Sequence, residues 1–231
     1  MASFYSVVLD LANVPCLVVG GGLVAQRKIQ ELIEAKAKIT VVSPTLVTEL
    51  TYLHSKGAIT YTPRRYVKED IEGMRLVFAL TDDARVNANI AQDARRVGAF
   101  VNVSDNPKLC SFVVPAVVHR GDVHVAVSSS GRSPALTRAL RQYLERVLPT
   151  ELEELANYFG VLRKQILSLD LSAKERHECL KSLVTADLYR EWQQGEYSGL
   201  ATHVQRICEG YGLDTPPLPK HSHRQEKTIE E

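Results

Sequence analysis

The chain has 231 residues, of which 45% are hydrophobic and 24% charged, and its formal net charge is +1. This is the composition of an ordinary globular protein, and the near-neutral charge provides no bulk field to attract nucleic acid or membrane. Its apolar runs fall short of the ~20 residues that span a bilayer, and residues 1–10 lack the features of a signal peptide. The four cysteines are scattered without a CxxC pair, so we expect reduced thiols and a cytoplasmic location.

Strand and helix patterns alternate along the first hundred residues. Strands are expected over residues 6–10, 16–19, 38–42, 59–63, 76–80 and 100–103. Helices are expected over residues 24–34, 44–56 and 83–98, with Pro44 in the first turn of the second. This alternation predicts an α/β fold with a doubly wound, parallel sheet of the Rossmann type.

The pattern changes after residue 110. Two strands, 111–118 and 123–128, are joined by His119-Arg-Gly-Asp122, whose Gly-Asp pair favours a hairpin turn. A helix follows over 134–147 with Ser133 as its cap, and only helices are expected beyond it, over 152–167, 173–184, 186–192 and 199–209. We therefore expect a Rossmann domain over 1–112, a small central region over 113–148, a helical region over 149–212 and a disordered tail over 213–231.

A glycine turn, Gly20-Gly21-Gly22, separates the first buried strand from the first helix. In a dinucleotide fingerprint Gly20 permits the tight turn, Gly22 lets the backbone approach a pyrophosphate, and Ala25 keeps helix and strand close. The helix N-terminus adds N–H groups and a positive dipole end. The alternative is a glycine-rich turn that binds nothing.

Two further loops follow expected parallel strands, Ser43-Pro44 and Thr81-Asp82-Asp83. Open α/β sheets bind ligands at this edge, so the three loops should converge on one cofactor. Ser43 stands where an acidic residue usually binds the ribose hydroxyls. Its own hydroxyl can bond a ribose but cannot repel a 2′-phosphate. The preference between NAD and NADP is therefore less determined by the sequence than the fold is. The Thr-Asp-Asp segment is equally suited to capping the next helix, and both roles are compatible.

Asp105 lies just past another strand at the same edge and could accept a proton as a hydride leaves a substrate. From the local sequence alone, an Asx turn in Asp-Asn-Pro is the favoured interpretation. Ser128 and Arg132 in a serine-rich loop, with Arg138 and Arg141 on the helix after it, suit a carboxylate-binding surface. A capped helix with a solvated basic side fits these residues equally well.

The seven histidines form no HxxxH or HExxH pattern, so we expect no catalytic metal. His221 and His223 suit weak adventitious metal binding at most.

Five segments then occur in a fixed order. They are Val18-Val-Gly-Gly-Gly-Leu-Val-Ala-Gln-Arg-Lys28, Thr81-Asp-Asp83 with Val86-Asn87, Val101-Asn-Val-Ser-Asp105, Ser111-Phe112 with Pro115-Ala116, and Val125-Ala-Val-Ser-Ser129 with Ser133-Pro134. The ordered set resembles the sirohaem synthase dehydrogenase/ferrochelatase family, block by block over residues 1–148 and more loosely beyond them.

This resemblance implies oxidation of precorrin-2 to sirohydrochlorin with NAD⁺ as hydride acceptor, in a homodimer. It implies a Rossmann domain, a dimerisation region and a helical region, and it places the catalytic aspartate on Asp105, against the local preference for a turn. Together with the fingerprint, it gives the expected NAD contacts Gly20, Gly21, Gly22, Leu23, Val24, Ser43, Pro44, Thr81 and Asp82. The expected contacts to the carboxylate-rich tetrapyrrole are Ser128, Arg132, Arg138 and Arg141.

Some family members also insert Fe²⁺ to make sirohaem, and they share these motifs with the single-function dehydrogenases, so both activities stay open. Larger relatives append a methyltransferase domain after the helices, an activity not expected of a chain that stops at Glu231.

Two alternatives remain. An NAD(H)-sensing regulatory module would use the same glycine turn without Asp105 or the arginines. A generic dehydrogenase of the short-chain class is disfavoured because its Tyr-x-x-x-Lys pair is missing. The homodimer also has a physical motive, because a two-stranded hairpin is marginal alone and a partner chain could cover it.

Overall fold

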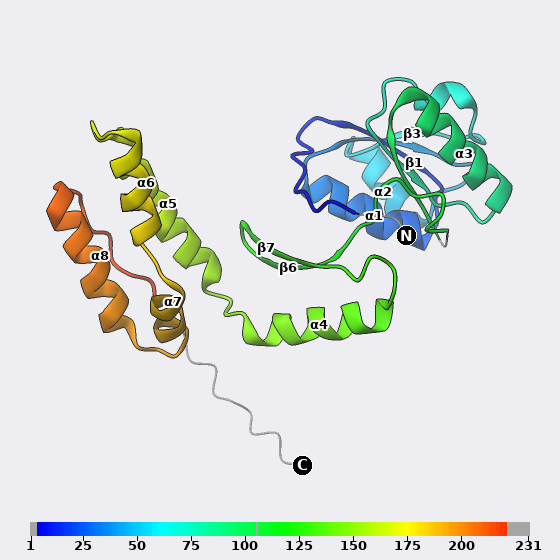
Figure 1. Ribbon diagram of the computed structural model, residues 1–231. Coiled ribbons are helices and arrows are strands. Elements are labelled where there is room, and N and C mark those ends of the chain that lie inside the picture. The colour runs from blue at the N-terminus through cyan, green and yellow to red at the C-terminus, as the bar shows by residue number, and fades with distance from the viewer. Residues whose placement is uncertain (1–3, 105, 221–231) are drawn as a thin grey trace, which may run out of the picture. The chain divides into compact units, whose positions relative to one another are not determined.

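The computed structural model describes residues 4–104 and 106–220. The chain divides into two compact units, one made of residues 1–114 with 130–132 and the other of residues 115–129 with 133–231. Figure 1 traces the elements of both.

The first unit is built on five parallel strands. They are β1 (Pro15–Val19), β2 (Lys38–Val42), β3 (Thr60–Thr62), β4 (Leu76–Ala79) and β5 (Phe100–Val103). Their spatial order is β3-β2-β1-β4-β5, so the direction of winding reverses between β1 and β4. The expected Rossmann-type sheet is confirmed, and in such sheets the crevice beyond the reversal point holds the ligand.

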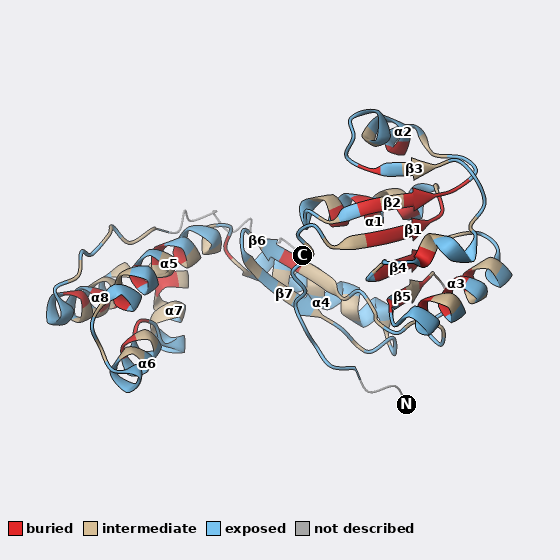
Figure 2. Cartoon of the chain, turned by 90° about the horizontal axis from the view of Figure 1, so that it is seen from above, coloured by how far each residue is buried: buried red, intermediate tan, exposed pale blue. Residues whose placement is uncertain are grey.

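Helices cover both faces of the sheet. On one face, α1 (Leu23–Glu34) and α2 (Thr48–Ser55) bury Ile29 and Leu50 in a cluster with Phe78 of β4. On the other, α3 (Ala84–Val97) and the short 3₁₀ helix η1 (Lys68–Ile71) form a second cluster, which includes Ile90. Figure 2 shows β1, β2 and β4 buried along most of their length, as strands covered on both faces must be.

Two expectations for this unit are wrong. Residues 6–10 form no strand, because β1 is already paired with β2 and β4; Val8 in this segment is 88% exposed. The second helix begins at Thr48 rather than Pro44. The residues before it form a loop that is bonded to the glycine turn, because the Val47 N–H donates to the carbonyl of Gly21.

The second unit opens with a hairpin. Strands β6 (Ala116–Arg120) and β7 (Val123–Val127) pair antiparallel around Gly121-Asp122, which confirms the expected turn. Helix α4 (Pro134–Val147) follows, capped by Ser133, whose Oγ accepts from the Leu136 N–H at 3.3 Å. The first hairpin strand begins five residues later than expected because residues 111 and 112 bond to β5 instead.

Four helices follow α4 in the described part of the chain, as expected. They are α5 (Leu152–Ser168), α6 (Ala173–Ser182), α7 (Ala186–Gln193) and α8 (Tyr197–Tyr211). Their core centres on Leu162, Trp192 and Val204, each fully buried.

Residues 213–219, which we expected in a disordered tail, pack on these helices instead. The Trp192 Nε1–H donates to the carbonyl of Pro219 at 2.8 Å, and Gln165 exchanges two hydrogen bonds with the backbone of Asp214. Leu213 and Leu218 reach the helical core, so this proline-rich stretch has enough apolar surface to be held. The rest of the predicted tail, residues 221–231, lies outside the described residues.

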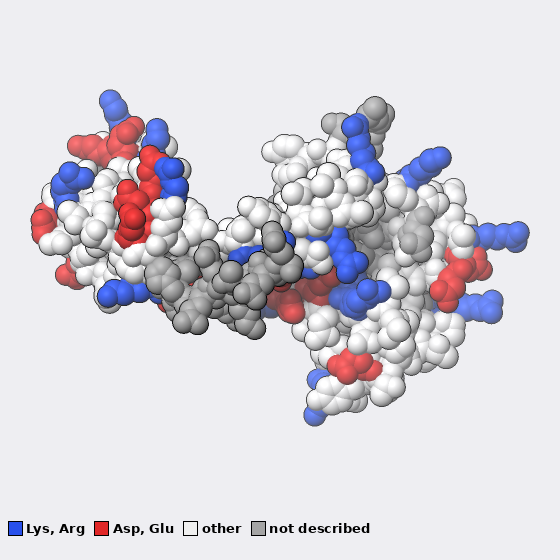
Figure 3. All heavy atoms as spheres, turned by 90° about the horizontal axis from the view of Figure 1, so that it is seen from below, with Lys and Arg blue, Asp and Glu red and all other residues white. Residues whose placement is uncertain are grey.

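No helix within residues 4–104 and 106–220 combines the length and apolar character needed to cross a bilayer. All four cysteines are free thiols, and burial raises the pKa of Cys16 to about 11. Figure 3 shows basic and acidic side chains near one another on the face it displays.

We expect the Leu162→Ala variant to lower the free energy of unfolding of the helical unit by about 2–5 kcal/mol, because it leaves a cavity in the core. Trp192 is the chain's single tryptophan and is buried in the same cluster, so its emission during urea denaturation reports this unit. The matched control is Leu167→Ala on the same helix, where the side chain is 47% exposed and the expected loss is about 0.5 kcal/mol or less. Equal losses in the two variants would contradict the assigned core.

Candidate dinucleotide-binding site

Gly20 marks the end of β1 and has a φ of +130°, which side chains other than glycine rarely tolerate. A Cβ there would lie 2.5 Å from the carbonyl oxygen of Leu80, the residue that follows β4. The Leu80 N–H in turn donates to the carbonyl of Val19 at 2.8 Å. The glycine turn is therefore pressed against the end of β4.

Gly21 is restricted by the loop on the other side. A Cβ on Gly21 would lie 2.0 Å from the carbonyl oxygen of Thr45, and the Gly21 carbonyl accepts from the Val47 N–H at 2.9 Å. The loop between β2 and α2 is thus fastened to the glycine turn. Two of the loops expected to converge meet here, and the third begins at Leu80.

Gly22 differs from Gly20 and Gly21, because no described atom outside its own chain neighbours lies within 4 Å of the position that its Cβ would occupy. It is the N-cap of α1, provides no side-chain cap, and is followed by a first turn without acidic residues. Leu23 and Val24 in that turn are 67% and 46% exposed, whereas Ala25 is buried against the sheet. The first N–H groups and the positive dipole end of α1 therefore face open space, which fits the pyrophosphate of a dinucleotide.

Ser43 lies at the end of β2 and is almost buried. Its Oγ donates to the carbonyl of Thr45 at 2.8 Å, and its carbonyl accepts from the Tyr61 hydroxyl at 3.0 Å. The hydroxyl proton is committed to the loop, which leaves the oxygen lone pairs to accept from a ribose hydroxyl. In a contact with a ribose hydroxyl, the Ser43 Oγ would therefore be the acceptor.

Thr81, after β4, is held by a residue that sequence reasoning did not assign to the site. The buried Asn87 side chain accepts from the N–H and Oγ of Thr81 at 3.2 and 2.7 Å, and its amide donates to the Thr81 carbonyl at 2.9 Å. Asn87 thereby fixes the turn that leads from the sheet edge into α3. Its place in the family block Val86-Asn87 was the available signal.

Asp83 is the N-cap of α3. Its Oδ1 accepts from the N–H groups of Arg85 and Val86 at 2.8 and 3.3 Å, so the capping interpretation is confirmed for this residue. Asp82 beside it is exposed at the same edge, and its contact with a cofactor stays a prediction.

Asp105 lies outside the described residues, but the bonds that close the loop around it are defined. The N–H of Val103 donates to the Cys110 Sγ at 3.2 Å, and that thiol bonds the carbonyl of Asn106 at 3.5 Å. The Ser111 Oγ accepts from the Val101 N–H at 2.7 Å. Side chains and backbone of residues 110–112 thus occupy the free edge of β5 and bring the two ends of the loop together.

The four residues expected to bind substrate lie in two places. Ser128 and Arg132 are exposed in the loop before α4, and Arg138 is exposed on the helix. Arg141 is half-buried and forms an ion pair with Glu145, so its charge is already partly compensated. Whether these residues bind substrate stays a prediction.

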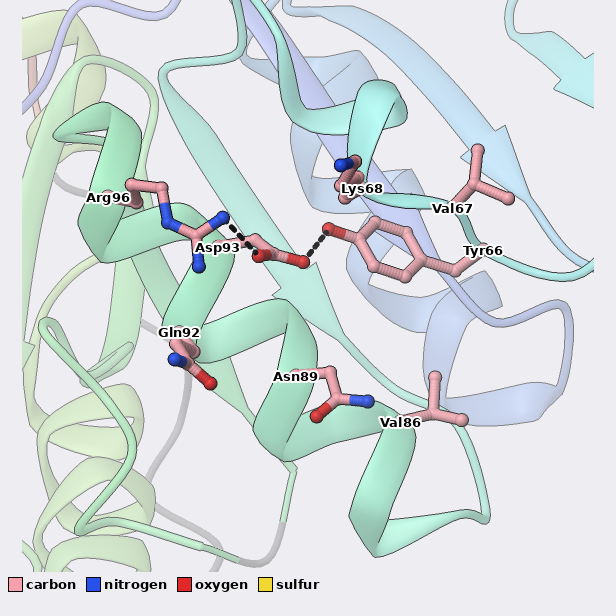
Figure 4. A pocket seen from close by; sticks show the side chains of 8 residues that line it. All are labelled: Tyr66, Val67, Lys68, Val86, Asn89, Gln92, Asp93 and Arg96. Carbon is pink, nitrogen blue, oxygen red and sulfur yellow. Dashed lines mark hydrogen bonds and ion pairs between the residues drawn. The ribbon is translucent and has the colours of Figure 1, made fainter.

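A pocket of about 380 Å³ opens between α3 and the segment that enters η1, and none of the expected site residues lines it. Figure 4 shows the Tyr66 hydroxyl directed at the Asp93 carboxylate, to which it donates at 3.0 Å, with Arg96 on the other carboxylate oxygen at 3.5 Å. Burial and this hydrogen bond raise the pKa of Tyr66 well above its usual value. The network fastens the segment before η1 to α3.

We expect Gly21→Ala and Gly22→Ala to separate folding from ligand binding. The Gly21→Ala methyl overlaps the Thr45 carbonyl, so its loss of stability should be about 1–3 kcal/mol, the usual cost of overpacking. The Gly22→Ala methyl meets open space at a φ of −89°, so unfolding should be unchanged while dinucleotide binding weakens. Thermal melts and calorimetric titration with NAD⁺ measure the two effects. Unweakened binding by Gly22→Ala would contradict a close approach of the pyrophosphate.

Comparison with known proteins places these features in a family. Residues 7–116 match the family described as "Putative NAD(P)-binding". Siroheme synthase 1 of Aeromonas salmonicida is 41% identical over 177 residues, and the siroheme synthase of Chromobacterium violaceum is 38% identical over 211 residues. These alignments cover 77% and 91% of this chain but 38% and 45% of the relatives, so the chain spans less than half the length of the curated relatives it matches.

A solved structure agrees with the sequence relatives. "SirC, precorrin-2 dehydrogenase" superimposes with a TM-score of 0.71 and 26% identity, over 89% of this chain and 100% of that chain. The resemblance in the sequence is thereby confirmed, and NAD is the cofactor that the matched domain supports. The chain is thus similar to siroheme synthases and to a precorrin-2 dehydrogenase, and residues 7–116 carry its NAD-binding domain.

Proposed function

We propose that this chain oxidises precorrin-2 to sirohydrochlorin with NAD⁺. The observation that carries the proposal is the open N-terminus of α1 at Gly22, located where the winding of the sheet reverses. Support comes from the likeness to a structure titled precorrin-2 dehydrogenase over its whole length and from relatives named siroheme synthases.

The chemistry divides between cofactor and protein. When bound, NAD⁺ supplies the acceptor for the hydride that leaves the macrocycle. The N–H groups at the start of α1 would hold the pyrophosphate, and the Thr81–Asn87 bonds set the shape of the adjoining edge. The protein's task is to align the two rings and to accept a proton.

Asp105 is the base in this proposal. The family block Val101-Asn-Val-Ser-Asp105 supplies the assignment. The Cys110 thiol bonds Val103 and Asn106, described residues that lie to either side of Asp105 in the sequence. The carboxyl end of β5 lies at the sheet edge that carries the glycine turn, because the carboxyl ends of parallel strands share one edge.

The substrate carries several carboxylates, and exposed arginines are suited to bind them. On α4, Arg138 is the stronger candidate, because Arg141 shares its charge with Glu145. Arg132 is exposed in the loop before this helix. Ser128 is exposed in the same loop and can add a hydrogen bond.

We expect Asp105→Ala to lower kcat for NADH formation by about 10²–10⁴-fold, the usual contribution of a positioned base, with NAD⁺ affinity and melting temperature retained. NADH absorbance in a mixture of protein, precorrin-2 and NAD⁺ measures the rate. Asp170→Ala removes an exposed carboxylate between α5 and α6 and is the matched control, expected to leave the rate unchanged. Normal turnover by Asp105→Ala would remove this residue from the mechanism. NAD⁺ binding by the unaltered chain without turnover would favour the sensing module instead.

Insertion of Fe²⁺ into sirohydrochlorin is a second candidate activity. It is favoured by the matched relatives, which are named after sirohaem rather than after its metal-free precursor. Fe²⁺ is a substrate in this reaction, and its insertion releases pyrrole protons that Asp105 could also collect. Adding Fe²⁺ to sirohydrochlorin and protein without NAD⁺ tests this activity apart from the oxidation.

We further propose that the region over residues 113–148 forms a homodimer through α4. This helix, described over its whole length, has no buried residue, and its apolar residues gather on one side. Leu136, Leu140, Tyr143 and Val147 occupy that side and are 54%, 43%, 55% and 37% exposed. A second copy of the chain would remove this stripe from water.

We expect Leu140→Lys to shift the protein from dimer to monomer, because it places a charge in the middle of the stripe. Gln142→Lys adds the same charge away from the stripe and should leave the dimer intact. Sedimentation velocity at micromolar concentration measures both. A monomeric unaltered chain, or equal behaviour of the two variants, would contradict the α4 interface.

A further inference from the structure

We propose that His119 and His124 form a chelating site for a divalent transition-metal ion. The two residues lie directly opposite each other in the hairpin, His119 on β6 and His124 on β7. Their ring centroids are 4.5 Å apart with an angle of 70° between the planes, and both residues are exposed. The two histidines are five positions apart in the sequence, a spacing that matches no helical metal-binding motif. It is the strand pairing that brings their side chains together.

The turn determines this pairing. Gly121 and Asp122 form a two-residue connection, and the positive φ of Gly121, +57°, is what the first position of a type II′ turn requires. The pair that closes such a turn, Arg120 and Val123, is the hydrogen-bonded one. His119 and His124 therefore occupy the next, non-hydrogen-bonded position, where side chains come closest across an antiparallel ladder.

The hairpin behind the two rings is firmly held. The Arg120 guanidinium donates to the carbonyl of Glu145 at 2.6 Å and to that of Leu148 at 3.1 and 3.2 Å, at the C-terminal end of α4. Val118, on the same side of the hairpin as Arg120, is buried. Because side chains alternate between the two sides of a strand, His119 and His124 project away from α4 on a backbone that needs little ordering to bind.

The chemistry of two imidazoles selects the metal. Imidazole nitrogen suits Co²⁺, Ni²⁺, Cu²⁺ and Zn²⁺, whereas Mg²⁺ and Ca²⁺ prefer oxygen ligands. No group of three potential ligands occurs among residues 4–104 and 106–220, so water must complete the coordination shell. The site is therefore a reversible two-imidazole chelate on the second unit.

Titration of the untagged full chain with Ni²⁺, followed by calorimetry, tests the site, with Mg²⁺ as the negative probe. We expect one Ni²⁺ per chain, and His119→Thr or His124→Thr should each weaken it at least about tenfold, since even groups behind a metal ligand are worth ~10–100-fold. Threonine favours strands, which preserves the hairpin.

The variant His221→Ala/His223→Ala is the matched control and should retain the full affinity. NADH formation without added metal should be unchanged in the threonine variants, so this inference and the proposed activity can fail separately. Undiminished Ni²⁺ binding by the threonine double variant, or its loss on removal of His221 and His223, would overturn the site. Binding of Mg²⁺ as tight as that of Ni²⁺ would overturn it as well.

Discussion

The absence of a Cβ at Gly20 and Gly21 is the constraint on which the candidate site depends. Carbonyl oxygens approach the turn from two directions, Leu80 from the end of β4 and Thr45 from the loop after β2. Any side chain would push one of these loops away and open the edge of the sheet. The outcome is that α1 begins within a framework of three strands, with its N–H groups directed outward at Gly22.

Backbone groups and buried polar side chains define this edge more than charged groups do. Ser43 and Asn87 are both nearly buried, and both bond to the loop beside them. Each such bond adds only modestly to stability, but a buried polar group left without its bond loses a large amount of free energy. The loops therefore have one preferred shape.

In the second unit, the two sides of the hairpin carry residues with different roles. One side of the hairpin carries Val118 and Arg120 against α4, and the other carries the two histidines toward solvent. Helix α4 likewise has one side on the hairpin and an apolar stripe beyond it. This alternation lets a short hairpin support both the proposed association between copies and a metal-binding surface without conflict.

The sequence by itself determined the parallel sheet, the glycine turn, the Asp83 and Ser133 caps and the hairpin turn. These depend on local patterns of apolar residues, glycines and capping side chains, which the chain shows over a few residues at a time. Only the tertiary structure decided why Gly21 must be glycine, that Asn87 holds Thr81 and that Leu213 and Leu218 join the helical core. Each of these depends on which segment lies across from the residue, and no pattern within either segment specifies its partner.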